Sequence, residues 1–319
     1  MRELIIGKND AGQRLDKFLS KAVKGMPTSI MYKSIRTKKI KVNRKRAEQN
    51  TMLAEGDTVQ LFVREEFFDS PDKDESALER IVPKLNIVYE DENIMLLNKR
   101  QGVLVHEDTA GNENTLIMHI KAYLLQKGEY NPDDEQSFAP SLCNRIDRNT
   151  GGIVIAAKNA AALREMNEHI KEGHIGKFYL CAVHGVPSPK SATLRGWLFK
   201  DSKTNKVYVT EEKQRGSKEI ITKYKVISEK KGNALLEVRL ITGRTHQIRA
   251  HMSHIGHPLL GDGKYGINKD ERTKGYKYQA LYAYRLIFDF AKDESILSYL
   301  SGKEFSVPKD QIWFVEDFK

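Results

Sequence analysis

One short stretch of the sequence combines a carboxylate, several cations and a polar loop in an arrangement suited to covalent catalysis. Residues 141–158 read Ser-Leu-Cys-Asn-Arg-Ile-Asp-Arg-Asn-Thr-Gly-Gly-Ile-Val-Ile-Ala-Ala-Lys. Asp147 lies between Arg145 and Arg148, and nearby cations favour the ionised form of a carboxylate. An ionised carboxylate at the mouth of a sheet is a candidate nucleophile. A structural Asp–Arg pair is the alternative explanation of the same residues.

The elements that must position this loop follow from the spacing of apolar residues. Residues 153–157 are apolar without interruption, which predicts a strand buried on both faces. A helix capped by Asn159 is expected next, with Gly173 near its end. Further strands are predicted over 176–185 and 234–241.

Three other patterns suggest chemistry but have simpler explanations. The paired acids that a glycosidase uses occur in residues 90–92, but these form the tight turn between two strands predicted within 86–99. Residues 261–266 lack the Lys-Ser/Thr ending of a phosphate-binding loop. The histidines of residues 246–257 match no common zinc spacing, and we predict no metal site; they are His246, His251, His254 and His257.

Composition limits the class of protein. The 319 residues suffice for two domains, and 39% hydrophobic residues can fill their cores. No stretch approaches the roughly 18 apolar residues of a spanning helix, and the N-terminus resembles no secretory signal. Two cysteines, Cys143 and Cys181, cannot build a disulfide framework, so we expect a cytoplasmic protein without membrane contact. A net charge of +10 favours polyanionic partners.

The charges are unevenly distributed along the chain. Residues 65–79 are mostly acidic, which is typical of a linker. We therefore expect an amino-terminal domain over 1–64, a linker over 65–83 and a second domain over 84–319. Eight bases without an acid among them lie close together in the first domain: Lys33, Arg36, Lys38, Lys39, Lys41, Arg44, Lys45 and Arg46. They can contact the phosphate backbone of a nucleic acid. The alternative is that these bases simply form a solvent-exposed surface without such a partner.

The first domain is predicted to have the order α-α-β-β. Apolar residues at helical spacing indicate a helix from Leu15 that Gly25 ends, and a second helix is expected near 27–36. Strands are predicted at 40–43 and 58–63. The motifs Arg-Leu-Asp-Lys-Phe-Leu (14–19), Lys-Ile-Lys-Val-Asn (39–43) and Glu-Gly-Asp-Thr-Val (55–59) resemble the S-four RNA-binding module. That resemblance implies an RNA partner.

From residue 84 to about 315, motifs in order resemble the RluA-type pseudouridine synthases. They are Glu90-Asp91, Asn98-Lys99, Gly102-Val-Leu-Val-His106, Arg145-Ile-Asp147-Arg with Thr150-Gly-Gly, Lys177-Phe-Tyr179, Thr242-Gly-Arg-Thr-His-Gln-Ile-Arg249-Ala-His-Met and His257-Pro-Leu-Leu-Gly-Asp262. Two positions depart from the family pattern. Asn144 replaces the usual His before the Arg, and Arg100 replaces the usual Pro after the Lys.

The resemblance implies an α+β fold in which a mixed, mostly antiparallel bisected sheet surrounds a cleft. It implies that Asp147 is the catalytic acid and that Arg249 pairs with it through a bidentate guanidinium. Tyr179 would stack on the extruded uracil, and Arg145 would fill the space that the base vacates. The reaction of this family, the isomerisation of uridine to pseudouridine in RNA, involves no redox step and no net hydrolysis. No cofactor is therefore expected.

Members of the family with an amino-terminal RNA module mostly modify large-subunit ribosomal RNA, which is therefore the expected substrate. Nothing implies an obligate protein partner. Three alternatives remain at this point. They are a synthase acting on transfer RNA, a non-catalytic RNA-binding or ribosome-assembly factor, and a hydrolase that releases free uracil.

Overall fold

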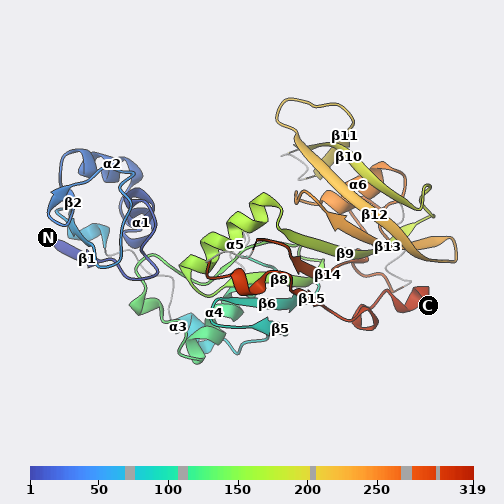
Figure 1. Ribbon diagram of the computed structural model, residues 1–319, viewed down its shortest axis with the longest axis horizontal. Helices are drawn as coiled ribbons and strands as arrows, with labels where there is room; N and C mark the ends of the chain where they lie inside the picture. Colours follow the sequence, from blue (N-terminus) through green and yellow to red (C-terminus); the bar gives the residue numbers. More distant parts are fainter. Residues whose placement is uncertain (69–75, 107–113, 202–205, 267–274, 292–294) are drawn as a thin grey trace. The chain divides into compact units, whose positions relative to one another are not determined.

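The computed structural model describes residues 1–68, 76–106, 114–201, 206–266, 275–291 and 295–319 (Figure 1). The chain forms two compact units. The first comprises Met1–Lys84, Met118–Ser141 and Ala157–Leu163, and the second comprises Leu85–Ile117, Leu142–Ala156 and Arg164–Lys319. Two segments after residue 84 thus belong to the first unit, and the predicted domain boundaries stay predictions. Within the described ranges, no helix combines the length and apolarity needed to cross a membrane.

The first unit is built on a four-stranded antiparallel sheet in the order β1-β4-β2-β3. Its strands are β1 (Arg2–Ile5), β2 (Ile40–Val42), β3 (Lys45–Arg46) and β4 (Thr58–Leu61). Helices α1 (Leu15–Ala22) and α2 (Thr28–Arg36) confirm both predicted helices, and β2 and β4 confirm the predicted strands. Strand β1 was not predicted, because its residues are largely exposed and give no alternating pattern.

The apolar stripe of α1 packs into the core of this unit, where Leu15, Phe18 and Leu19 are almost completely buried. The prediction that Gly25 caps α1 is wrong, since the helix ends at Ala22 with Val23 as its cap. Gly25 instead lies against the backbone of Phe67, whose carbonyl oxygen would be 2.6 Å from an added Cβ. The glycine is therefore required for close packing.

The acidic segment predicted as a linker begins with a 3-10 helix, Glu65–Phe67, and Phe67 belongs to the core of the first unit. Residues 69–75 of that segment lie outside the described residues, and helix α3 (Ser76–Arg80) follows. Helix α4 (Leu116–Gln126) and the 3-10 helix Pro132–Asp134 come later in the chain.

The second unit contains an eleven-stranded mixed sheet. Nine strands follow the order β11-β10-β12-β13-β9-β14-β8-β6-β5, while β15 pairs with β14 and β7 with β8. The strands are β5 (Ile87–Glu90), β6 (Ile94–Lys99), β7 (Ser141–Leu142), β8 (Gly151–Ala157), β9 (Ile175–His184), β10 (Ser191–Asp201), β11 (Lys206–Thr210), β12 (Lys218–Lys230), β13 (Asn233–Leu240), β14 (Leu281–Phe288) and β15 (Glu304–Ser306). Consecutive pairs from β11 to β14 are antiparallel, and β8 runs parallel to β14, which confirms the predicted mixed, mostly antiparallel sheet.

Two helices, both labelled in Figure 1, are close in sequence to the polar motifs. Helix α5 (Ala160–Glu172) begins after Asn159, whose side chain accepts a 2.8 Å hydrogen bond from the Ala162 N–H as predicted. Helix α6 (Gln247–His254) contacts β11 and β12. Short 3-10 helices lie at Ser298–Leu300, Lys309–Gln311 and Glu316–Phe318.

Strand β8 follows the Asp147 loop and is buried at all seven positions, as its apolar sequence predicts. Its second residue, Gly152, pairs with Ala283 of β14 and has a φ of 115°. An added Cβ would lie 2.1 Å from the Ala283 carbonyl oxygen. Only glycine therefore allows the two strands to approach this closely.

We predict that Gly152→Ala lowers the free energy of unfolding by about 3 kcal/mol or more, because the backbone of β14 must move. Gly232→Ala is the matched control, since Gly232 has a φ of 74° but no atom within 4 Å of an added Cβ. That control should cost only about 1–2 kcal/mol. Urea unfolding followed by circular dichroism measures both, and equal losses would contradict the packing argument.

Candidate active site

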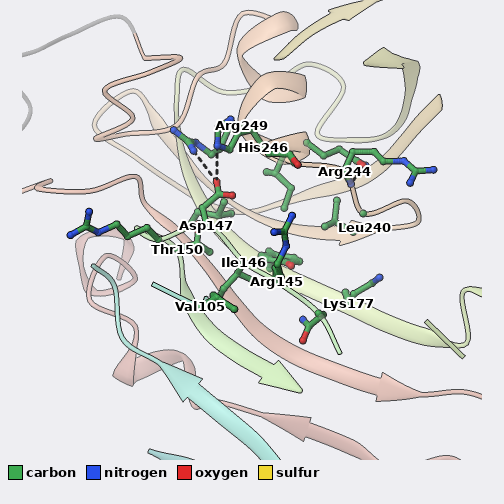
Figure 2. A pocket seen from close by; sticks show the side chains of 18 of the residues that line it. Val105, Arg145, Ile146, Asp147, Thr150, Lys177, Leu240, Arg244, His246 and Arg249 are labelled. Carbon is green, nitrogen blue, oxygen red and sulfur yellow. Dashed lines mark hydrogen bonds and ion pairs between the residues drawn. The ribbon is translucent and has the colours of Figure 1, made fainter. Parts of the chain in front are cut away.

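The predicted site residues meet in one open cavity of the second unit, with a volume of about 460 Å³. Arg145 and Asp147 enter it from the loop before β8, and Arg249 enters it from α6 (Figure 2). Tyr179 of β9 also lines it. Lys177, Leu240 and Arg244 also line the wall. Ligand cavities of roughly 300–1,000 Å³ hold small organic molecules, so this cavity has the volume of a small-molecule site.

The central contact of the cavity is an ion pair between Asp147 and Arg249. The Arg249 Nη1 donates to Asp147 Oδ2 at 2.8 Å, as Figure 2 shows. The prediction of a bidentate Asp147–Arg249 pair is wrong, because Arg249 directs its fork at Asp262. Its Nε and Nη2 lie 2.7 and 2.8 Å from the two oxygens of Asp262. Arg249 thus bridges two carboxylates, and Asp147 Oδ1 accepts no hydrogen bond from the described residues.

Asp147, Arg249 and Asp262 form a triad, in which Asp262 is the buried carboxylate. Its side chain is completely inaccessible, and one oxygen also accepts backbone N–H groups of Lys264 and Tyr265. Burial alone would raise the pKa of Asp262, but the hydrogen bonds and charge of Arg249 hold it below its ordinary value. Burial likewise opposes the charge of Arg249, yet its two carboxylate partners keep its pKa above the usual range. The guanidinium is therefore permanently charged.

Tyr179 lies at the middle of β9, between Val238 of β13 and Ala283 of β14. Only 7% of this residue is exposed. Burial, together with the charge of Asp147, raises the pKa of its hydroxyl. The hydroxyl therefore remains protonated at neutral pH and can donate a hydrogen bond within the cavity.

His246 was not predicted as a site residue, but it lines the cavity. It has a φ of 54°, a strained backbone conformation for a residue other than glycine. Its Nδ1 lies 2.9 Å from the Tyr265 hydroxyl, and its Nε2 lies 3.8 Å from Asp147 Oδ2. Burial, reinforced by the charge of Arg249, lowers the pKa of His246 despite the opposing effect of Asp147. A neutral imidazole at neutral pH follows.

Lys99 at the end of β6 anchors the loop that carries Asp147. Its buried ammonium donates to the carbonyls of Arg100, Val103 and Arg148 at 2.9–3.0 Å. The Gly102 N–H also donates to the Arg148 carbonyl, at 2.9 Å. Burial lowers the pKa of Lys99 to about 8, and the charge of Asp147 opposes this shift. The sequence signal was the Asn98-Lys99 motif, which gave Lys99 no role.

The two departures from the family pattern lie in these supporting segments. Asn144 Oδ1 accepts a 2.8 Å hydrogen bond from the Ile155 N–H, and the Cys143 N–H donates to the Ile155 carbonyl at the same distance. Asn144 thus ties the loop before Asp147 to strand β8. Arg100 contributes its backbone carbonyl to Lys99, an acceptor that every residue type supplies.

The four histidines of residues 246–257 do not gather around a common point. His251 Nδ1 lies 3.0 Å from Thr222 Oγ1, and His257 Nδ1 lies 2.8 Å from the His184 carbonyl. Among the residues that the structure describes, no group of three potential metal ligands includes any of the four.

We predict that Asp262→Asn destabilises the protein by about 3–5 kcal/mol, because it removes one partner of a buried ion pair. The pKa of Asp262 is below its ordinary 3.8 in the folded chain, so its contribution is present above about pH 4 and is lost as the pH falls further. As the pH falls below 4, the unfolding free energy of the variant should therefore decrease less steeply than that of the unaltered protein. Urea unfolding at several pH values tests this, with the exposed Asp310→Asn as the control.

Comparison with known proteins identifies a family model and several relatives that match this chain. A family model described as RNA pseudouridylate synthase matches residues 93–254. An uncharacterized RNA pseudouridine synthase of Mycoplasma genitalium is 33% identical over 291 residues, covering 90% of this chain and 88% of that protein. The ribosomal large subunit pseudouridine synthase C of Buchnera aphidicola is 35% identical over 273 residues, covering 83% and 81%.

A solved structure, human RNA pseudouridylate synthase domain containing 1, shares the fold. It has a TM-score of 0.55 and 21% identity, and the match covers 72% of this chain and 84% of the human one. The family model and the relatives agree with the resemblance drawn from the motifs. The chain belongs to the RNA pseudouridylate synthase family and is an isomerase that acts on RNA.

Proposed function

We propose that this enzyme converts uridine to pseudouridine in large-subunit ribosomal RNA, with Asp147 as its catalytic residue. The observation that carries the proposal is the carboxylate of Asp147 at the wall of an open cavity, paired with a permanently charged guanidinium. The similarity to a protein named ribosomal large subunit pseudouridine synthase C supports ribosomal RNA as the substrate class.

The reaction breaks the bond from ribose C1′ to uracil N1 and forms a bond from C1′ to C5. The proton on C5 leaves and N1 gains one, so the atoms balance without a cofactor. Asp147 acts as a charged carboxylate, either on the anomeric carbon or on a ribose proton. Both routes need an oxygen with a free lone pair, and Oδ1 offers it because Arg249 holds Oδ2.

Tyr179 and Arg145 are proposed to hold the displaced base and the RNA that it leaves. A base that reacts in folded RNA must first leave its stack, at a cost of a few kcal/mol. The ring of Tyr179 lies in the cavity wall and can stack on uracil, while its protonated hydroxyl donates to the substrate. Arg145 is exposed at the same wall, where its planar guanidinium can occupy the vacated place in the stack.

The amino-terminal α-α-β-β region is proposed to be an S-four-type RNA-binding module. Its basic run surrounds the end of α2 and the strands β2 and β3. Seven of the eight bases are exposed and Lys41 is half-buried. None of the eight forms an ion pair with a described acid. Positive charge that no carboxylate neutralises is available to RNA phosphates.

We predict that replacing Lys38, Arg44 and Arg46 by Gln weakens RNA binding and flattens its salt dependence. Each lost phosphate contact should reduce the slope of log K against log salt by about 0.7–0.9. The matched control replaces Lys8, Lys17 and Lys21, which are exposed in the same unit but outside the basic run. Filter binding at several salt concentrations measures both, and equal slopes for the two triple variants would contradict the assignment.

We predict that the purified protein releases tritium from C5 of labelled uridine in ribosomal RNA, without added metal or nucleotide. Asp147→Asn should lower the rate by at least about a thousandfold while RNA binding is retained. Unchanged release by this variant would exclude Asp147 as the catalytic residue. Release from transfer RNA alone would overturn the proposed substrate class, and production of free uracil would indicate a hydrolase.

A further inference from the structure

Helix α5 ends in a turn that brings two histidines together. Gly173 follows the helix with a φ of 83°, and the His174 N–H donates to the His169 carbonyl at 2.9 Å. This six-residue closure is the Schellman motif, in which the side chains at the two ends of the turn meet. Apolar residues usually occupy these positions, whereas here both are imidazoles. The helix ending itself therefore sets the distance between His169 and His174.

The potential ligand atoms at this turn have the spacing of a coordinated ion. The two Nδ1 atoms of His169 and His174 lie 3.2 Å apart, and Glu172 Oε2 lies 3.4 Å from His174 Nδ1. All three ligand atoms are within 4.8 Å of one another. Tetrahedral zinc with bonds of about 2.0–2.1 Å holds neighbouring ligands at about 3.3 Å. Two of the three distances already have this value.

The surroundings of His169 resemble the outer shell of a metal site. Its ring is stacked on Phe290, with centroids 3.9 Å apart and planes 5° apart, which fixes the direction of Nδ1. Its buried Nε2 has no hydrogen-bond partner and lies 3.7 Å from Glu165 Oε1. The Leu297 N–H holds that same carboxylate oxygen at 3.0 Å. A histidine that ligates through one nitrogen commonly directs its other N–H at a carboxylate.

The opposite side of the cluster is open to solvent. The side chains of Glu172 and His174 are 47% and 40% exposed. An ion can therefore enter without unfolding, and a water can complete the fourth position. Two nitrogens and one carboxylate oxygen form a ligand set that zinc accepts.

We propose that His169, Glu172 and His174 form a zinc site at the junction of α5 and β9. Without the ion, the Nδ1–H of one imidazole donates to the Nδ1 of the other. When zinc is bound, both Nδ1 atoms are unprotonated and each directs its lone pair at the metal. The His174 carbonyl accepts from the Asp289 N–H at 2.8 Å, so the ion would also stabilise the segment after β14. The site uses none of the side chains assigned to catalysis and does not depend on the proposed reaction.

Titration of the full-length protein with Zn²⁺ alone, by calorimetry and by metal analysis after dialysis, tests the proposal. We expect one ion per chain and a zinc-dependent rise in melting temperature. His174→Gln and Glu172→Gln should each weaken binding at least about tenfold and remove most of the rise. Both side chains are partly exposed, so these variants should fold, which melting without zinc verifies.

His254→Gln is the matched control, because His254 is an exposed histidine on a helix outside the cluster. It should bind zinc as the unaltered protein does. Absence of binding by the unaltered protein, or equal binding by the His174→Gln variant, would overturn the proposal. Co²⁺ gives an independent readout, since tetrahedral coordination produces a visible absorption that His174→Gln should abolish.

Discussion

The structure of the site depends on the buried guanidinium of Arg249, whose charge must be neutralised while its ion pair with Asp147 is kept. A lone charge inside a protein costs several kcal/mol, and a single exposed carboxylate could not offset the burial of Arg249. Asp262 meets that need from a completely buried position, with both oxygens engaged. The Nη1 group of Arg249 is then left to donate to Asp147 Oδ2, and Asp147 Oδ1 stays outside the ion pair. Asp262 thus neutralises the buried charge of Arg249, while one oxygen of Asp147 stays outside the ion pair.

The remaining contacts hold the loop and the strand that this triad requires. Lys99 donates to three carbonyls at the base of the Asp147 loop, and Asn144 ties the same loop to β8. Strand β9 is paired on both sides, so the position of Tyr179 is set by hydrogen bonds to β13 and β14. Gly152 allows β8 to approach β14. The Asp147 carboxylate therefore lies on a short loop whose two ends are fixed.

Local patterns predicted part of the secondary structure, whereas long strands such as β10, β12 and β14 were not predicted. The strand 153–157, the cap at Asn159 and the two amino-terminal helices follow from periodicity and capping. Motif resemblance selected Asp147, Tyr179 and Arg249, which the fold brings to one cavity. Sequence could not predict that the fork of Arg249 faces Asp262, because both acids are suitable partners and only the folded chain fixes the angles. The anchoring role of Lys99 was not predicted for a similar reason, since its three acceptors are backbone carbonyls and carry no residue signature.

The order of the triad along the chain has a consequence for biosynthesis. Asp147 is translated about one hundred residues before Arg249, and Asp262 follows later still. Domains form as the polypeptide emerges, amino-terminal parts first. A nascent chain that stops before α6 carries the acid without its counter-ion, and one that stops before Asp262 carries the guanidinium without its buried neutraliser. A chain that ends before Asp262 therefore lacks the assembled centre of Asp147, Arg249 and Asp262.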